Sequence, residues 1–491
     1  MRYSLEEILQ NTSSYVFYKN SDDIFEKEYE PTILLEQVTL KSKNKANPIF
    51  LPFKIPINDN ISDAFYSIKK AISNGARGFF FDEIRLKEEK YFNLLFEIIE
   101  QYKDKIDFII MTPDTLQAIF ELARYTLKNK FIKDVKVITV TGSVGKTSTT
   151  EMIYAILKEK YKVYRGEAMV NLRFRTNHKI IEADNDVDFL LFECSGANRG
   201  YPRIFSELLT PDAAVVTKVG TENLGIFKSL DGIAEQKCEL LTCLHTNNTA
   251  VLNDSPEIRR ASAKYNCKKV YTKEGDYKLI KSDKNGSTFI YKKNEYEIPV
   301  VGTHQINNAM KAIEVAKSFG MTYNDIKNGL AKFQSVGSRW NIDNFNGTTF
   351  VSDCPNNPSY ETMISCISTF VNLYKDIENK RIAISGIRSL GNHEKKVHTD
   401  LAEFIAKQPL KEVICLEPEA KVVYEYLKEH APDIQVKYYD KPKSLGKDEP
   451  FVKYIIDTLG ENQAFLMKGQ GIDPVIRYED VRITLKNVFE N

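Results

Sequence analysis

The most specific chemical signal in the sequence is a short glycine-containing stretch formed by Gly142, Ser143, Val144, Gly145, Lys146, Thr147 and Ser148. It follows a β-branched run over Lys136–Thr141 and opens a helical pattern over Ser148–Lys160. Glycines let backbone N–H groups turn around a phosphate, and a helix N-terminus adds positive potential. We expect Lys146 to reach the β- and γ-phosphates of a nucleotide and the Thr147 hydroxyl to ligate Mg²⁺. The spacing is two residues shorter than the general phosphate-loop pattern, but the strand–loop–helix context favours a nucleotide site over a chance turn.

A second signal is the carboxylate of Glu193, which ends a predicted strand over Phe189–Phe192. In a parallel sheet, a carboxylate at this edge can reach a Mg²⁺ ion held at the phosphate loop. An acidic residue at a strand end is more often a solvated or capping group. Its pairing with the loop therefore carries the prediction that Glu193 is catalytic and binds the metal.

The elements that must position these residues alternate between strands and helices, which predicts an α/β fold with a doubly wound parallel sheet. We predict three consecutive domains over residues 1–132, 133–334 and 335–491.

In the first domain the pattern predicts strands over Ile49–Ile55, Gly78–Phe81 and Phe108–Met111, and helices over Asp63–Gly75 and Asp114–Lys128. In the second it predicts further strands over Ala213–Lys218 and Thr249–Leu252, a small antiparallel element over Lys269–Val300, and helices over Gly302–Phe319 and Tyr323–Phe333. In the third it predicts strands over Thr348–Val351, Arg381–Ser385, Glu412–Leu416 and Ala464–Met467, and helices over Ser359–Tyr374, His398–Gln408 and Glu419–His430.

Composition narrows the class of partner. The chain has 491 residues, 42% hydrophobic and 27% charged, with a formal net charge of +1. Such a balance gives no global field for nucleic acid or a membrane surface. The seven cysteines are dispersed without metal-site spacing, and no apolar run approaches a membrane span. We expect a cytoplasmic, monomeric protein that acts on small molecules.

Several motifs in order resemble the Mur ligase superfamily. They are TGSVGKTST, FECSGANRG, Leu208–Gly220, Gly225–Leu241, Gly302–Ala312 and Arg381–His398. Within the superfamily, they are most similar to members that add D-alanyl-D-alanine to a UDP-muramoyl tripeptide. The resemblance covers the chain from about residue 135 onward. It implies a central P-loop domain that binds ATP and Mg²⁺, flanked by an N-terminal nucleotide-sugar domain and a C-terminal Rossmann-like domain for the incoming amine. The implied reaction is ATP-dependent amide formation between an acceptor carboxylate, UDP-muramoyl-peptide-like, and an amino acid or dipeptide through an acyl phosphate.

The resemblance also implies roles for individual residues. Lys237 matches a lysine that is carbamylated in the family, acts in catalysis and ligates a second Mg²⁺. His304 and Asn308, four apart on one helix, match a motif at the adenine side of ATP. Arg339 matches an arginine that contacts ATP phosphate, and Asp353 is expected to meet the ribose or to help domain closure.

Two further matches and three departures concern the substrates. Lys468–Gly471 resembles a family segment near the incoming amine, and His398 matches a histidine of the third domain. Where the family has a metal-associated histidine, the sequence has Asn223, whose carbonyl oxygen can still ligate Mg²⁺. The family's acceptor loop is not reproduced in Gly166–Thr176, which carries Arg173 and Arg175, and the segment after Asp353 lacks the family's aromatic residue.

These departures leave alternatives open. The chain could be a Mur-type ligase for another acceptor, such as a folylpolyglutamate, an amino-acid polymer or a secondary peptide. It could also be a nucleotide-binding partner protein that has lost catalysis. A P-loop kinase is a third alternative, although the three-domain length and the motifs after residue 300 speak against it.

Overall fold

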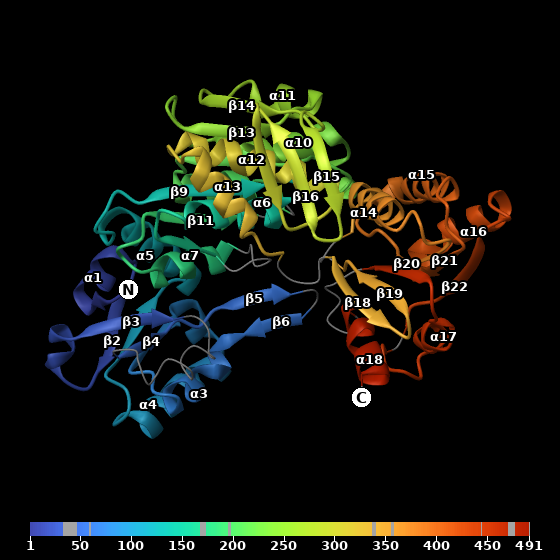
Figure 1. Ribbon diagram of the computed structural model, residues 1–491. Coiled ribbons are helices and arrows are strands. Elements are labelled where there is room, and N and C mark those ends of the chain that lie inside the picture. The colour runs from blue at the N-terminus through green and yellow to red at the C-terminus, as the bar shows by residue number, and fades with distance from the viewer. Residues whose placement is uncertain are drawn as a thin grey trace. The chain divides into compact units, whose positions relative to one another are not determined.

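The structure is a computed structural model that describes residues 1–32, 47–57, 60–166, 173–194, 198–335, 340–354, 358–442, 444–469 and 477–490 (Figure 1). The chain divides into two compact units. Residues 1–136 and 170–190 form the first unit, and residues 137–169 and 191–491 form the second. The boundaries at 132/133 and 334/335 stay predictions.

The first unit is built on a mixed six-stranded sheet in the order β1-β3-β4-β7-β8-β2. Its strands are β1 (Tyr3–Ser4), β2 (Tyr15–Lys19), β3 (Glu28–Thr32), β4 (Pro48–Phe50), β7 (Gly78–Asp82) and β8 (Phe108–Thr112). The described helices are α1 (Leu5–Asn11), α3 (Ile68–Ser73), α4 (Glu89–Tyr102), α5 (Thr115–Asn129) and α7 (Arg173–Glu182), with 3-10 turns η1 (Asp22–Glu26), η2 (Ala64–Ser67) and η3 (Glu83–Lys87). Strands β7 and β8 are buried along their whole length, which explains their continuous apolar sequences.

Two predictions for this unit are wrong in part. The strand expected over Ile49–Ile55 is two separate strands, β4 and β5 (Lys54–Ile57), and β5 pairs with β6 (Asn60–Asp63) in its own two-stranded sheet. The helix expected over Asp63–Gly75 begins later, because Asp63 ends β6 and its side chain caps the 3-10 turn η2 at the N–H of Phe65. Regular α-helix therefore starts only at α3.

The second unit begins with a six-stranded sheet in the order β10-β11-β9-β12-β13-β14. Its strands are β9 (Lys136–Thr141), β10 (Val163–Arg165), β11 (Phe189–Glu193), β12 (Ala213–Val216), β13 (Thr249–Asn253) and β14 (Lys268–Thr272). The associated helices are α6 (Lys146–Leu157), α8 (Tyr201–Leu209), α9 (Leu224–Phe227), α10 (Leu230–Cys238), α11 (Pro256–Ser262), α12 (Thr303–Ser318) and α13 (Tyr323–Ala331), with the 3-10 turn η4 (Glu239–Leu241). Strand β12 pairs in parallel with both β9 and β13, so their carboxyl ends lie at one edge.

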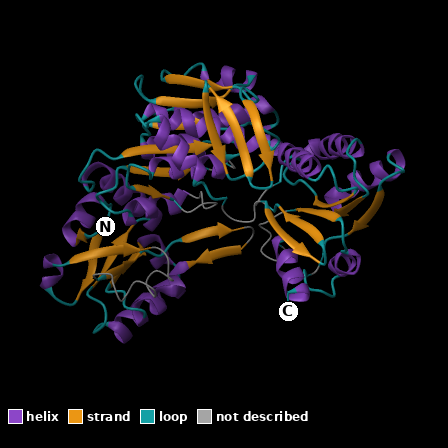
Figure 2. Cartoon of the chain, viewed as in Figure 1, coloured by secondary structure: helices purple, strands orange, loops and turns teal. Residues whose placement is uncertain are grey.

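A small antiparallel sheet follows, formed by β15 (Lys278–Asp283), β16 (Gly286–Tyr291) and β17 (Asn294–Ile298) (Figure 2). It confirms the predicted antiparallel element within Lys269–Val300. The start of that range instead belongs to β14, which pairs in parallel with β13.

The last sheet of the second unit has the order β18-β19-β23-β20-β21-β22. Its strands are β18 (Asn341–Phe345), β19 (Thr348–Ser352), β20 (Asn379–Ser385), β21 (Glu412–Leu416), β22 (Gln435–Tyr439) and β23 (Gln463–Lys468). Its helices are α14 (Tyr360–Leu373), α15 (Glu394–Ala406), α16 (Lys421–His430), α17 (Pro450–Thr458) and α18 (Glu479–Phe489), with 3-10 turns η5 (Gly391–His393) and η6 (Pro418–Ala420). All neighbours pair in parallel except β18, which is antiparallel to β19.

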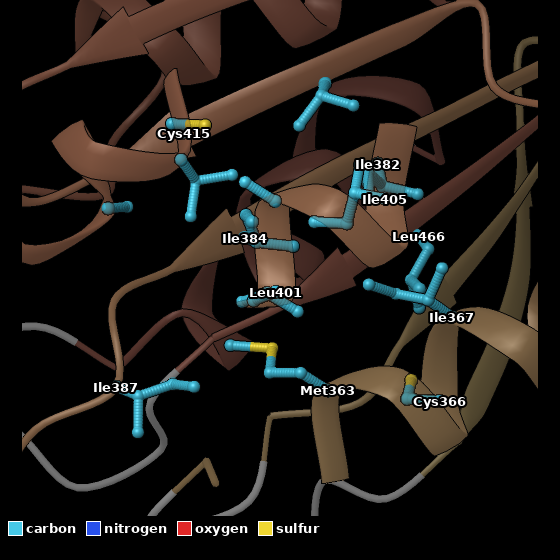
Figure 3. Packing of buried hydrophobic residues seen from close by; sticks show 14 of the residues in the cluster. Met363, Cys366, Ile367, Ile382, Ile384, Ile387, Leu401, Ile405, Cys415 and Leu466 are labelled. Carbon is cyan, nitrogen blue, oxygen red and sulfur yellow. The ribbon is translucent and has the colours of Figure 1, made fainter. Parts of the chain in front are cut away.

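Alternate residues of this sheet enter two different hydrophobic clusters. Ile382 and Ile384 of β20 pack with α14, α15 and α16, whereas Ala383 packs with α17 and α18. Figure 3 shows the first cluster, where Met363 and Leu401 approach the sheet from two helices. Helices therefore cover both faces, and the predicted α/β class with parallel sheets is confirmed.

Candidate functional site

The loop between β9 and α6, which we call the glycine loop (residues 142–145), has a backbone that only glycine adopts readily. Gly142 has φ +145° and Gly145 has φ +88°. A Cβ atom at Gly142 would clash with the side chain of Thr217, and one at Gly145 would clash with Asn308. Both glycines are therefore required by the backbone conformation and by the space around them.

The glycine loop is hydrogen-bonded to the segment that follows β12 and leads into the N-terminus of α6. The N–H groups of Ser143 and Val144 donate to the carbonyl oxygen of Lys218, at 2.8 and 3.2 Å. The first N–H groups of α6, beginning at Lys146, have no partner within the helix. A helix start with this geometry can bind an anion through backbone N–H groups and the helix dipole.

Lys146 is held at this helix start by oxygen atoms. Its Nζ donates to the carbonyl oxygens of Gly142 and Ser143, at 2.7 and 3.0 Å, and to Oε2 of Glu222 at 3.4 Å. The lysine side chain is only 13% exposed. Its ammonium group is thus positioned beside the N–H groups that would receive a phosphate.

The Thr147 hydroxyl and the Glu193 carboxylate meet directly. Thr147 Oγ1 donates to Glu193 Oε2 at 2.8 Å, which links the first turn of α6 to the end of β11. These are two of the four predicted Mg²⁺ ligands, and the structure brings them together.

The pair fits a Mg²⁺ ion. Neighbouring ligand oxygens of an octahedral Mg²⁺ lie ~3 Å apart, close to the separation of these two atoms. Among the described residues, no group of three or more His, Cys, Asp or Glu side chains is arranged to hold a metal. A Mg²⁺ ion here would therefore take its remaining ligands from substrate phosphates and water, as Mg²⁺ commonly does.

Lys237 lies in the same neighbourhood, but its contact was not predicted. It sits in the last turn of α10, is 1% exposed, and its Nζ is 3.6 Å from Oε2 of Glu222. Burial lowers the pKa of Lys237, while Glu222 opposes this effect. Burial likewise raises the pKa of Glu222, but Lys146 and Lys237 together outweigh it and hold that pKa below its usual value. Glu222 is thus a carboxylate shared by two lysines.

Asn223, the predicted replacement for a metal-binding histidine, follows directly. Its backbone is left-handed, with φ +60°, and the residue is 8% exposed. Its backbone carbonyl oxygen accepts a hydrogen bond from the N–H of Ile226 at 3.0 Å as α9 begins. Asparagine tolerates this conformation better than most residues, so a backbone requirement also accounts for its presence here.

The two predicted adenine-side residues lie on α12 but have different neighbours. Asn308 borders the glycine loop at Gly145, and its Nδ2 donates to Gln305 at 3.4 Å. His304 lies one turn earlier, and its Nδ1 is 2.9 Å from the hydroxyl of Ser365 on α14. Asn308 therefore belongs to the loop neighbourhood, whereas His304 connects α12 to α14.

Asp353 and Lys468 form a buried ion pair at the ends of β19 and β23. Lys468 Nζ lies 2.5 Å from Asp353 Oδ2, and the lysine side chain is 1% exposed. Burial raises the pKa of Asp353, but Lys468 outweighs this effect and the pKa is lowered. The structure thus joins the predicted ribose residue to the predicted amine-side segment. Arg339 lies outside the described residues, as do Gln470 and Gly471 of the predicted amine-side segment.

His398 is a structural residue rather than the helix-start histidine that the sequence suggested. Helix α15 begins at Glu394, so His398 lies in its second turn and is fully buried. Its Nε2 accepts the N–H of Ile387 at 3.0 Å, and its Nδ1 is 2.8 Å from the carbonyl oxygen of Glu394. Both nitrogens are used to hold the connection after β20.

Two acidic residues that shape this neighbourhood were not predicted from the sequence. Glu222 stood next to a departure from the family motif but gave no signal of its own. Glu361, in the first turn of α14, contacts Thr221 through both carboxylate oxygens. A carboxylate in the first turn of a predicted helix was visible in the sequence, but its partner was not.

Comparisons with known proteins agree with this geometry. Residues 140–316 match the Mur ligase middle domain. The resemblance to Mur ligases is thus supported over the central part of the chain.

The sequence relatives of the chain indicate which Mur ligases it resembles. It is 27% identical to the UDP-N-acetylmuramoyl-tripeptide–D-alanyl-D-alanine ligase of Bacillus subtilis, over 69% of this chain and 74% of the relative. It is 26% identical to the ligase of the same name from Borreliella burgdorferi, over 82% of this chain and 84% of the relative.

Solved structures show the same fold. MurF from Acinetobacter baumannii superposes with a TM-score of 0.78 at 20% identity, over 100% of this chain and 99% of that chain. MurF from Thermotoga maritima, solved in complex with ADP, gives a TM-score of 0.73 at 20% identity, over 94% of this chain and 98% of that chain.

Proposed function

We propose that the chain is an ATP-dependent ligase that joins an amine to the terminal carboxylate of a UDP-muramoyl tripeptide, with D-alanyl-D-alanine as the amine. The observation that carries the proposal is the contact between Thr147 and Glu193 at the start of α6, where Lys146 is held against the glycine loop. The names of the sequence relatives support the choice of substrates. We further propose that it acts on these small molecules as a cytoplasmic monomer with three domains.

The proposed chemistry requires neutralisation of charge. A substrate carboxylate and the γ-phosphate of ATP are both anionic and repel each other. Lys146 and the N–H groups of α6 would stabilise the charge that accumulates on the transferred phosphoryl group. Thr147 and Glu193 would hold a Mg²⁺ ion, which supplies further positive charge to the phosphates. Asn308 would line the adenine side of the glycine loop.

The second half of the reaction needs an oriented amine rather than a protein nucleophile. The acyl phosphate formed in the first step reacts with the amine, and phosphate leaves. The Asp353–Lys468 pair, at the carboxyl ends of two parallel strands, lies where ligands of open α/β sheets commonly bind. We propose that this pair orients the amine side of the reaction and that Arg339 contacts ATP phosphate.

The test is a ligation assay with mass-spectrometric detection of the amide product and parallel measurement of ADP. The purified chain receives Mg-ATP and a UDP-muramoyl tripeptide, with D-alanyl-D-alanine or with single amino acids. We expect amide and ADP in equal amounts only with the dipeptide. A product with another acceptor, such as a folate with glutamate, would reassign the substrate, and ADP without amide would indicate a kinase or ATPase. No nucleotide turnover with any acceptor would favour a non-catalytic nucleotide-binding protein.

A further inference from the structure

Glu222 connects two lysines for which the sequence predicted separate roles. Its Oε2 atom lies 3.4 Å from the Nζ of Lys146 and 3.6 Å from the Nζ of Lys237. The three side chains are 18%, 13% and 2% exposed, respectively. One carboxylate oxygen therefore serves both ammonium groups in a neighbourhood with little water.

This arrangement does not fit a carbamylated Lys237 with a second Mg²⁺. A carbamate on Nζ would place a new negative charge against the carboxylate of Glu222, which already contacts that atom. Without a cation between them, two anions at such a distance repel strongly where water is scarce. The nearby position expected to supply a metal-binding histidine holds Asn223, which has no imidazole.

We propose that Glu222 is a positioning residue that holds Lys146 and Lys237 together, and that Lys237 acts as an unmodified lysine. Lys237 then contributes positive charge beside the glycine loop, where a second metal ion would otherwise do so. The catalytic consequence rests on the proposed ligase function, whereas the chemical state of Lys237 does not.

The physical consequence of removing Glu222 follows from charge balance. Without its carboxylate, two nearby lysines lose their shared partner and repel each other. The more exposed Lys146 would move away from the position that it shares with the carbonyl oxygens of Gly142 and Ser143. Phosphoryl transfer would slow because a preorganised charge is lost.

The first experiment is independent of catalysis. The full-length protein is equilibrated with ¹³C-labelled bicarbonate and its carbamate signals are recorded by NMR. We expect the spectrum of the wild-type chain to equal that of Lys237→Ala. A bicarbonate-dependent signal that disappears in Lys237→Ala would overturn the proposal. This result stands even if the chain forms no amide, so it separates this inference from the proposed function.

The second experiment tests positioning with Glu222→Gln and Glu222→Asp. We expect Glu222→Gln to lower kcat by about 10²-fold, as for loss of one preorganised charged contact, with little change in the KM of the amine. Glu222→Asp keeps the charge and should recover part of the rate. Glu207→Gln, at an exposed ion pair on α8, is the matched control and should behave as wild type. Wild-type kcat in Glu222→Gln would contradict the proposal. If that variant fails to fold, a wild-type rate in Glu222→Ser, checked to be folded, would contradict it equally.

Discussion

The carboxylate of Glu361 accepts hydrogen bonds from both the backbone N–H and the hydroxyl group of Thr221. The N–H lies 3.1 and 3.0 Å from the two carboxylate oxygens, and the hydroxyl lies 3.1 Å from Oε2. The N–H of Tyr360 in turn donates to the Thr221 hydroxyl at 3.2 Å. The start of α14 therefore fixes the residue that immediately precedes Glu222.

Glu361→Ala should destabilise the second unit because Thr221 loses a charged acceptor. Hydrogen bonds to charged groups contribute about 1.5–3 kcal/mol each, and we expect a loss in this range in the free energy of unfolding. Urea denaturation measures it. Glu403→Gln, at an exposed position on α15, is the control. An unchanged denaturation midpoint in Glu361→Ala would show that the contact does not contribute.

Lys146→Ala should abolish amide formation while the fold survives, because the side chain is directed to carbonyl oxygens and Glu222 rather than to the hydrophobic core. We expect a fall in kcat of at least about 10²-fold. Circular dichroism checks folding, and Lys158→Ala, exposed at the end of the same helix, serves as the control. Full activity in Lys146→Ala would rule out its phosphate role.

Thr147→Val should raise the Mg²⁺ concentration that gives half-maximal ADP release. Even residues that only support metal ligands change metal affinity by about 10- to 100-fold, so loss of a direct ligand should cost at least as much. Thr147→Ser keeps the hydroxyl that contacts Glu193 and should stay close to wild type. A chelator should stop the reaction, and added Mg²⁺ should restore it. Equal Mg²⁺ dependence in the two variants would refute the assignment.

Asp353→Asn should be strongly destabilising because it leaves the buried Lys468 ammonium without its anion. Removal of one partner of a buried pair costs about 3–5 kcal/mol. Adding Lys468→Met should restore part of the loss, and a double-mutant cycle measures the coupling. The pKa of Asp353 is lowered in the folded chain, so the pair stabilises above the unfolded carboxyl pKa. This stabilisation should be lost as the pH falls through the folded value.

Lys311 is a buried group whose substitution should stabilise the chain, in contrast to Asp353→Asn. It is 2% exposed on α12, and its Nζ donates to the carbonyl oxygen of Asn307 at 3.1 Å. Burial lowers the pKa of Lys311 to about 8. The unfolded chain therefore binds more protons above that pH, and stability rises with pH until the unfolded value of about 10.4 is reached.

Near neutral pH this burial costs about 3 kcal/mol, so Lys311→Met should be more stable than wild type there. The difference should shrink as the pH rises from 8 towards 10.4. Urea denaturation across this pH series measures it, with the exposed Lys327→Met as control. A difference that does not vary with pH would contradict the role of burial.

The sequence predicted best where strands are buried on both faces. The ranges Lys136–Thr141 and Glu412–Leu416 are the bounds of β9 and β21, because continuous apolar or β-branched runs mark central parallel strands. Strand β18 was missed, since Asn341, Asp343 and Asn344 give an antiparallel edge strand a polar sequence. Its identity depends on pairing with β19, which no local pattern contains.

The residues of the candidate site likewise fall into those that could be placed from the sequence and those that could not. Lys146, Thr147 and Glu193 could be placed at one edge of the sheet from the sequence, because their positions follow from the ends of regular elements. The role of Glu222 could not be found, because it lies in an irregular connection whose path depends on Thr221 and Glu361. The partner of Asp353 was equally hidden, since Lys468 is 115 residues away in sequence.

The first unit is formed by two separate stretches of chain, and this has a consequence for biosynthesis. The N-terminal amine of Met1 and the hydroxyl of Tyr3 both donate to the carbonyl oxygen of Ile181 on α7. Helix α7 also packs on α5. A nascent chain released only as far as residue 136 would leave these groups and the apolar surface of α5 uncovered. The ribosome must therefore deliver β9, α6 and α7 before this amino-terminal body can finish folding, and truncation before residue 190 should yield an aggregation-prone fragment.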